Sequence, residues 1–252
     1  MSNPAVITRE MSETFRVATY NIHKCKGIDL QVSPRRIADV LGEIDADVIA
    51  LQEVVSIEGG SAEKNQSRFI ARELGFKFTV GENRRHLGGG YGNVVLSRFP
   101  IIEDSNLDIT VRGREPRGCL HTAVELSPND FLHIYNIHLG TAFFERRKQV
   151  MRLLDTEILN REHSGPRVML GDFNEWTHGL TSRLLKDHFQ SPDLREALGR
   201  KRTYPGVLPF LHLDHIYYDG HLKLEKASVH RSRTALVASD HLPLIADFRI
   251  NK

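Results

Sequence analysis

Polar side chains that can do chemistry occur in this chain at the places where apolar runs stop. Three carboxylates, Glu53, Asp172 and Asp240, lie beside such runs, and so do the amides of Asn21 and Asn174. Carboxylate and amide oxygens in a set that lacks cysteine favour Mg²⁺ or Mn²⁺ over zinc. The residue types therefore predict a site for a divalent cation whose ligands come from distant parts of the chain.

Two histidines and another carboxylate occupy similar positions. Asn136 and His138 end one apolar run, His241 directly follows Asp240, and Asp214 lies within a later run. Imidazole groups can donate protons or hydrogen bonds to phosphoryl oxygens. Combined with a divalent cation, these groups are the components needed for hydrolysis of a phosphate ester.

The first fifty residues indicate how two of these groups are positioned. A strand candidate at 15–21 ends on Asn21, and a second one at 47–51 precedes Glu53. Between them, Ser33 is placed as an N-cap and Pro34 as the first residue of a helix. This helix has a buried face with i, i+3, i+4, i+7 spacing, made by Ile37, Val40, Leu41 and Ile44. The segment is therefore predicted to be a right-handed β-α-β unit.

The rest of the chain alternates in the same way, without a linker, a repeat or a low-complexity segment. Helices are predicted near 66–74, ending at Gly75, and from about 143 to 159. Strands are predicted at 76–80, 91–97, 118–126, 130–137, 167–170, 213–218, 222–230 and 243–250. We expect residues 1–13 to form a flexible tail and residues 14–252 to form a single domain with two sheets and helices outside them.

Composition excludes several classes of protein. Of the 252 residues, 40% are hydrophobic and 26% are charged, which excludes a disordered or fibrous chain. The net charge of +2 does not by itself indicate a nucleic-acid partner. No apolar stretch approaches the roughly 18 residues of a membrane helix, and no signal peptide is recognisable. Cys25 and Cys119 offer neither a disulfide framework nor zinc spacing, so a cytoplasmic protein is expected, with a secreted protein holding one disulfide as second choice.

Seven short motifs follow one another in order between residues 15 and 250. They are Thr19–His23, Leu51–Val54, Tyr91–Ser97, Asn136–Leu139, Gly171–Asn174, Leu213–Ile216 and Ser239–His241. This series resembles that of the endonuclease/exonuclease/phosphatase superfamily, the deoxyribonuclease-like metal-dependent phosphohydrolases. The resemblance implies an α+β fold, a four-layer α-β-β-α sandwich with two packed mixed sheets.

The resemblance also implies roles for the residues that match its motifs. Glu53 matches the principal metal-binding carboxylate, Asn21 lies close to it, and Asp240 matches the second acidic position at the metal. Asp172 matches the residue that orients or deprotonates the attacking water. Asn174 would hold the scissile phosphate.

The histidine roles follow from the same resemblance. His241 matches the histidine at the phosphate, with Asp214 fixing its tautomer, and His138 matches a second donor to phosphoryl oxygens. Whether one metal ion or two operate stays open.

Two departures from the family pattern bear on the substrate. The abasic-site endonuclease branch has an acidic residue where this chain has His23, followed by Lys24, and a Tyr-containing segment where this chain has Asn136–Leu139. Both departures favour branches with deoxyribonuclease, sphingomyelinase or phosphoinositide phosphatase activity. His23 is either a substrate contact or a solvated loop residue.

Arginine-rich segments precede several motifs and are predicted in loops. They are Arg84–Arg85, Arg112–Arg117, Arg200–Arg202 and Arg231–Arg233. One interpretation is that several of them converge on the site rim, but for any single segment an ordinary charged loop is the preferred interpretation. Arg117 is the one expected to contact phosphate, because guanidinium binds phosphate in a bidentate manner. The basic run Arg146–Lys148 is expected on a solvated helix face. Gly88–Gly90 is expected to form a hairpin or lid.

The sequence thus predicts a Mg²⁺- or Mn²⁺-dependent phosphodiesterase or phosphatase. The substrate stays open between nucleic acid, a phospholipid head group and a small phosphate ester. A nuclease predicts a basic groove, whereas a lipid substrate predicts an apolar rim, for which the candidates are Phe143, Phe144, Leu208 and Phe210. The alternative is a catalytically silent binding module on the same fold. The sequence does not indicate an oligomeric state.

Overall fold

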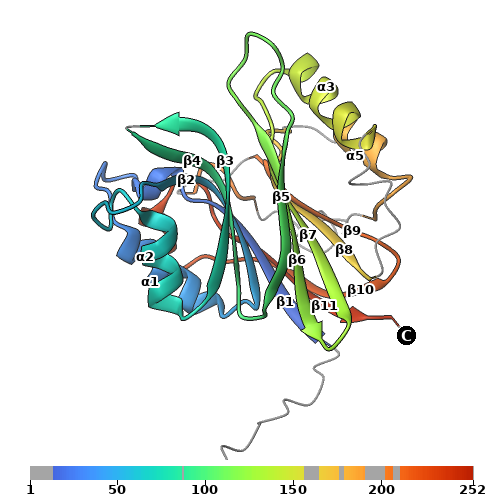
Figure 1. The fold of residues 1–252 in the computed structure, drawn as a ribbon, viewed down its shortest axis with the longest axis horizontal. Helices are drawn as coiled ribbons and strands as arrows, with labels where there is room; N and C mark the ends of the chain where they lie inside the picture. The colour runs from blue at the N-terminus through green and yellow to red at the C-terminus, as the bar shows by residue number, and fades with distance from the viewer. Residues whose placement is uncertain are drawn as a thin grey trace, which may run out of the picture.

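Two β-sheets packed face to face form the centre of the molecule, with helices on their outer faces (Figure 1). The computed structural model describes residues 14–86, 88–155, 165–175, 179–190, 202–206 and 211–251. The predicted tail at 1–13 and the predicted helix end at 156–159 lie outside these residues. The four-layer α-β-β-α sandwich of mixed sheets is confirmed.

The first sheet has six strands in the order β10-β11-β1-β2-β4-β3. Their bounds are β10 Leu222–Val229, β11 Leu244–Ile250, β1 Thr14–Asn21, β2 Val48–Ser56, β4 Gly89–Ser97 and β3 Lys77–His86. β1 and β2 are parallel, as the β-α-β prediction requires, and the other pairs are antiparallel.

The second sheet has five strands in the order β5-β6-β7-β8-β9. Their bounds are β5 Ile101–Asp108, β6 Gly118–Ser127, β7 Asp130–His138, β8 Arg167–Asp172 and β9 Asp214–Tyr218. β7 and β8 are parallel, and both have an antiparallel neighbour. β5 was not predicted, because this edge strand is mostly exposed. It carries polar residues in succession, without the alternation of apolar and polar residues that marks a half-buried strand.

The helices within the described residues are short and cover the outer faces. They are η1 His23–Cys25, α1 Pro34–Ile44, α2 Gln66–Leu74, α3 Phe143–Leu154, α5 Leu180–Leu185 and α7 Ala235–Ala238. α1 starts where predicted: the Arg36 amide donates to Ser33 Oγ, and Pro34 takes the first turn. α2 ends at Gly75 in the left-handed conformation, as expected of a helix C-terminus.

Three apolar clusters hold the layers together. Between the sheets, residues of β1 such as Val17 pack against residues of β7 and β8 such as Ile134 and Leu170. Alternate residues of the same strand, such as Ala18, face α1 and α2 in a second cluster. The third cluster lies between the second sheet and α3. Cys25 and Cys119 are free and buried in different clusters.

Polar contacts also join the two sheets, at a fully buried amide network. The Asn136 amide on β7 donates from Nδ2 to the carbonyls of Leu51 and Val94, both at 2.9 Å. Gln52 Nε2 donates to Asn136 Oδ1 at 2.8 Å, and Asn93 Nδ2 donates to the Asn136 carbonyl at 3.1 Å. Asn136 ends an apolar run as the site residues do, but the structure places it in the sheet interface.

Asn136→Leu should therefore destabilise the fold by about 3 kcal/mol, because it removes three hydrogen bonds and leaves buried polar groups unpaired. Urea denaturation measures this free energy. The matched control is Asn106→Leu on the exposed strand β5, whose Nδ2 donates to the Glu82 carbonyl and to Asn83 Oδ1. Water can replace these exposed hydrogen bonds, so a loss of at most about 1 kcal/mol is expected. Equal midpoints for the two variants would contradict a bracing role for Asn136.

Among the described residues, no helix has the length and apolar character needed to cross a membrane.

Candidate functional site

A pocket of about 280 Å³ opens where the ends of β1 and β2 meet those of β7 and β8. Its wall contains eight of the nine residues predicted for the site, which are Asn21, Glu53, Arg117, His138, Asp172, Asn174, Asp240 and His241. The ninth, Asp214, is fully buried and contacts His241. Residues spread over more than two hundred positions of the chain thus share one cavity.

Strand register explains why three of these residues form a row. His138 on β7 pairs with Asp172 on β8, and Asp172 pairs with Asp214 on β9. Paired residues on neighbouring strands point to the same face of a sheet, roughly 5 Å apart. The row therefore needs no special loop to assemble it.

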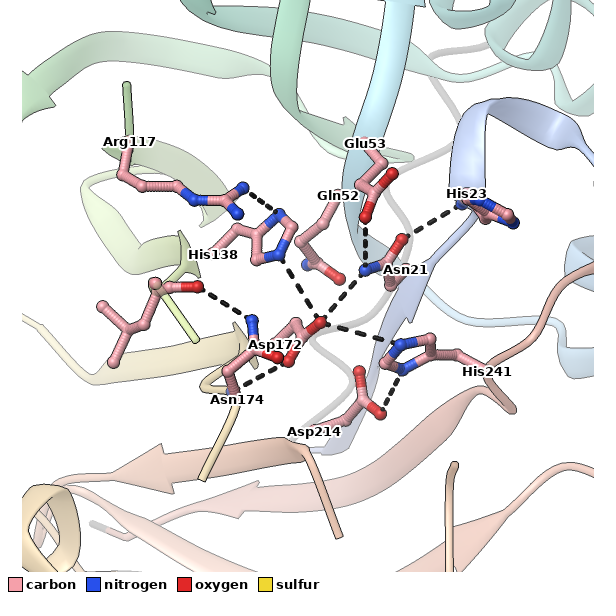
Figure 2. A network of polar contacts seen from close by, with 12 residues as sticks. Asn21, His23, Gln52, Glu53, Arg117, His138, Asp172, Asn174, Asp214 and His241 are labelled. Carbon is pink, nitrogen blue, oxygen red and sulfur yellow. Dashed lines mark hydrogen bonds and ion pairs between the residues drawn. The ribbon is translucent and has the colours of Figure 1, made fainter. Parts of the chain in front are cut away.

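Asp172 lies at the centre of the polar network (Figure 2). Its carboxylate accepts hydrogen bonds from Asn21 Nδ2 at 3.0 Å and from the Asn174 amide at 2.9 Å. The Nε2 atoms of His138 and His241 lie 3.6 and 3.7 Å from Asp172 Oδ2, one on each side. Burial raises the pKa of this carboxyl above its usual value, although His241 and His138 oppose the shift. A buried carboxylate with a raised pKa is suited to accept a proton.

His241 is held as a donor by the carboxylate behind it. Its Nδ1 lies 2.9 Å from Asp214 Oδ2, and its Nε2 points at Asp172 (Figure 2). Burial alone would lower the pKa of His241, but the charges of Asp214, Asp172 and Asp240 raise it to about 10. His241 is therefore an imidazolium at neutral pH, with Nε2–H facing the pocket.

His138 is the opposite case, because an arginine contacts its other nitrogen. Arg117 Nη1 lies 2.9 Å from His138 Nδ1, and a guanidinium can only donate. His138 Nδ1 therefore accepts, and the proton of the neutral ring sits on Nε2, toward Asp172. Burial and the Arg117 charge lower the pKa of His138 to about 4. Arg117 was predicted to contact phosphate; it lines the pocket and also fixes this tautomer.

Glu53 projects into the pocket from an irregularity in β2. The pairing of β2 with β4 shifts between Leu51 and Val54, and Glu53 has a φ of 59°. Its carboxylate accepts from Lys24 Nζ at 2.7 Å and from Asn21 Nδ2 at 3.3 Å. Burial would raise the pKa of Glu53, but His138, Lys24 and Asn21 lower it to about 2. The group is a carboxylate at every relevant pH.

Backbone strain is concentrated at this pocket. Of the eight non-glycine residues with positive φ among the described residues, His23, Lys24, Glu53 and Asn174 belong to the pocket wall or contact it. Such conformations cost of order 1 kcal/mol each and occur most often at functional sites. Gly171 is required for another reason, because a Cβ there would lie 1.9 Å from the Ile137 carbonyl oxygen.

A divalent cation has suitable oxygen donors on one side of the pocket. Glu53 is ionised, and Asp240 is partly exposed, with His23 Nδ1 3.7 Å from its Oδ1. Asn21 lies beside them, with its Oδ1 accepting from the His23 amide and its Nδ2 facing the carboxylates. These donors fit Mg²⁺ or Mn²⁺, which bind through one or two carboxylates and several waters.

A second group of possible ligands, Asp172, Asp214 and His241, lies deeper. Both ring nitrogens of His241 face carboxylates there, and its raised pKa means that a proton occupies the position a metal would need. The oxygen donors near Glu53 and Asp240 therefore suit a cation better than this group does.

Most of the arginine-rich segments lie away from the described pocket wall. Arg84 and Arg85 belong to strand β3, and not to a loop. Arg84 stacks on Tyr91 at 4.4 Å and pairs with Glu115 at 3.3 Å. Of the run predicted on a solvated helix face, Arg147 and Lys148 are exposed as expected. Arg146 is half-buried and donates to the carbonyls of Gly140 and Thr141, so the prediction was wrong for this residue.

Other predicted rim segments do not contribute to the described pocket wall. Arg112, Arg114, Arg231 and Arg233 are exposed in loops or turns. Arg202 lies 2.9 Å from His212, whereas Arg200, Lys201, Leu208 and Phe210 fall outside the described residues.

Lys24 and Tyr204 are among the residues at the site to which the sequence analysis assigned no role. Lys24 forms the ion pair with Glu53, and its only signal is that it directly follows the first motif. The ring of Tyr204 lies 4.8 Å from that of His241 and closes one side of the pocket. A turn-forming neighbour, Pro205, gave no hint of this contact.

Comparison with known proteins places these residues in a wider context. A model of the Endonuclease/Exonuclease/phosphatase family matches residues 18–241. The Escherichia coli K12 protein YbhP, itself named as uncharacterized, is 31% identical over 251 residues, which cover 94% of this chain and 97% of YbhP.

Two solved structures show the same fold at lower identity. An endonuclease/exonuclease/phosphatase from Beutenbergia cavernae has a TM-score of 0.72 and 23% identity, covering 94% of this chain and 72% of that one. The mannosyl-6-phosphatase of Bacteroides thetaiotaomicron has a TM-score of 0.73 and 16% identity, covering 93% and 99%.

Proposed function

Because this chain belongs to the endonuclease/exonuclease/phosphatase family, whose members are phosphoester hydrolases, we propose that it is a phosphodiesterase that uses Mg²⁺ or Mn²⁺. One observation carries this proposal. Asp172 lies between the Nε2 atoms of two histidines whose other nitrogens are fixed by Arg117 and Asp214. A base flanked by two oriented donors matches in-line attack of water on a phosphate.

Each residue has a part in this reaction. Asp172 would hold the attacking water and accept its proton, for which its raised pKa is suited. His241 and His138 would donate from Nε2 to the phosphoryl oxygens, where negative charge grows in the transition state. The Asn174 side chain would lie against the scissile phosphate, held by its bond to the Leu139 carbonyl at 2.9 Å.

Glu53 and Asp240, with Asn21 beside them, would hold the cation. The cation, when bound, supplies further stabilisation of charge on the phosphoryl oxygens. The fixed donors need no reorganisation during the reaction, which is the usual source of large electrostatic effects in catalysis.

The test is hydrolysis of bis-p-nitrophenyl phosphate with Mg²⁺ or Mn²⁺, followed by addition of a chelator. We expect turnover that stops on chelation and returns with added metal. Turnover that continues in chelator would contradict the metal-dependent mechanism. A mononitrophenyl ester measured in parallel distinguishes a diesterase from a monoesterase such as the mannosyl-6-phosphatase.

Glu53→Ala should remove most turnover and weaken Mn²⁺ binding measured by calorimetry, because it deletes the carboxylate assigned to the cation. The matched control is Glu58→Ala, an exposed glutamate on the same part of the chain. Normal Mn²⁺ affinity in the Glu53 variant would show that the metal binds elsewhere. If the unmodified protein binds Mn²⁺ but hydrolyses no ester, it is a silent binding module.

A further inference from the structure

Exposed apolar side chains cluster near the pocket. The described residues include seven large hydrophobic residues with exposed side chains, which are Ile28, Leu30, Val32, Ile102, Phe143, Phe144 and Met151. Six of them fall into two groups, one in the loop after η1 and one on α3. Single exposed apolar residues need no explanation, but clusters mark interaction surfaces.

The first group lies at the start of α3. Phe143 and Phe144 are 52% and 74% exposed, and their rings form an edge-to-face pair 5.5 Å apart. Thr141, which lines the pocket, is only two residues before Phe143, so the pair follows the pocket wall directly in the chain. The connecting segment is fixed by Arg146 and by a bond from the Gly140 amide to Gln149 at 2.8 Å.

The second group forms the tip of a tight loop at 26–32. Ile28, Leu30 and Val32 are 47%, 72% and 44% exposed. The loop is closed by an antiparallel β-bridge between Lys26 and Val32 and by a hydrogen bond from the Gly27 N–H to the Gln31 carbonyl at 3.0 Å. Leu30 has a φ of 65°, a costly conformation for leucine. The fold thus presents these aliphatic groups to solvent in a fixed arrangement.

Both groups adjoin the pocket from different sides. The loop follows Lys24, which contacts Glu53, and its Ile28 amide donates to Val237, three residues before Asp240. The α3 group follows Thr141. In Figure 1 the blue segment after β1 lies at the left of the molecule and α3 at the upper right, with the two sheets between them.

Basic residues accompany the apolar ones on α3. Helical spacing places Phe144, Arg147, Lys148 and Met151 on one face, and Arg152 follows one turn after Lys148. Arg147, Lys148 and Arg152 are exposed, and the first two have no acidic partner in the part of the chain that the structure describes. Apolar and basic side chains on one exposed helix face are typical of surfaces that bind anionic membranes.

We propose that the loop at 26–32 and the exposed face of α3 dock on an anionic phospholipid bilayer, which makes membrane phospholipid the substrate class of the adjoining pocket. The docking stands on the surface alone, whereas the substrate class also rests on the proposed function. Both groups are continuous in sequence with residues at the pocket, through Lys24 and Thr141, so docking at either group would place lipid beside the pocket.

Two observations favour a bilayer over a nucleic acid. Ile28, Leu30 and Val32 have no ring to stack on bases, but they gain free energy in an apolar phase. The described pocket wall does not form the basic groove expected of a nuclease, because Arg117 is the only arginine among its described residues and it pairs with Glu115 at 3.0 Å. Lys24 is likewise paired, with Glu53.

The test is co-sedimentation of the full chain with phosphatidylcholine vesicles, with and without phosphatidylglycerol. We expect binding only when phosphatidylglycerol is present, weakened by salt. Phe143→Ser combined with Phe144→Ser should lower the partition coefficient at least about tenfold, and Leu30→Ser should lower it severalfold. Arg147→Glu combined with Lys148→Glu should abolish the preference for the anionic lipid.

The matched control is Ile102→Ser, which removes the remaining exposed apolar side chain, on β5, and should leave binding unchanged. Thermal denaturation checks that every variant is folded. Absence of vesicle binding by the unmodified chain would overturn the proposal, and so would binding of a single-stranded oligonucleotide that depends on Phe143 and Phe144. Vesicle binding without ester hydrolysis would leave the docking intact and overturn the proposed function and the substrate class.

Discussion

Asp172→Asn is expected to lower kcat for phosphoester hydrolysis by about a thousandfold, which is within the range for loss of a general base. Asp172 accepts hydrogen bonds from Asn21 and Asn174 and faces the Nε2 atoms of two histidines. An asparagine offers one acceptor in place of two and turns its NH₂ group toward other donors. The variant thus loses both the base and the arrangement of the donors around it.

Rates at saturating substrate and Mn²⁺ separate this effect from weaker binding. The matched control is Asp108→Asn, the same substitution at the exposed end of strand β5, which should leave kcat unchanged. Thermal denaturation of both variants tests for unfolding. A folded Asp172→Asn protein with a kcat near that of the unmodified chain would show that another group activates the water.

Local patterns were sufficient to predict most of the fold. Ser33 and Pro34 predicted the start of α1, and Gly75 predicted the end of α2, because caps depend on residues adjacent in sequence. The strand β5 was missed, because an exposed edge strand lacks the apolar alternation on which the prediction depends. The arginines of β3 were assigned to a loop for a similar reason: Arg84 and Arg85 extend a strand past its apolar part.

The members of the site were also predictable, but their pairing was not. Strand ends and motifs indicated Glu53, His138 and Asp172, and the register of parallel strands brings such positions together. The hydrogen-bond and ion-pair partners of each side chain depend on contacts between segments far apart in the chain. The bonds from Arg117 to His138 and from Lys24 to Glu53 are of this kind.

The same reason accounts for residues whose roles differ from expectation. Asn136 resembles a site residue in sequence, yet it bonds to carbonyls of the opposite sheet. Arg146 has the spacing of a solvated residue, but nearby carbonyls at the end of β7 accept its hydrogen bonds. A polar residue that follows an apolar run therefore indicates a contact, and the packing of the sheets decides whether that contact braces the fold or faces the pocket.

Asp214→Asn is expected to lower kcat at pH 8 by a factor of the order of 10² to 10⁴, comparable with loss of the aspartate that orients a catalytic histidine elsewhere. Asp214 Oδ2 lies 2.9 Å from His241 Nδ1 and is the leading favourable cause of the raised pKa of His241. Without that charge, burial lowers the pKa of His241 toward or below its ordinary value of about 6.5. The ring is then neutral at neutral pH: it keeps one N–H, as His138 does, but loses the positive charge with which the imidazolium would stabilise the phosphoryl oxygens and the proton that it could transfer.

The dependence of kcat on pH distinguishes this electrostatic role from a structural one. His241 is protonated below its pKa of about 10, so the unmodified chain should lose activity only as the pH rises toward that value. In Asp214→Asn the same alkaline decline should begin near neutral pH. Asp219→Asn is the matched control, because Asp219 is also buried at the end of β9 but bonds to Arg167 at 2.9 Å. The control should be less stable, but its kcat should decline at the same alkaline pH as the kcat of the unmodified chain. If the alkaline decline of kcat moved to lower pH in both variants, the effect would come from the packing of β9. If the decline stayed at the same pH in Asp214→Asn, His241 would not be the proton donor.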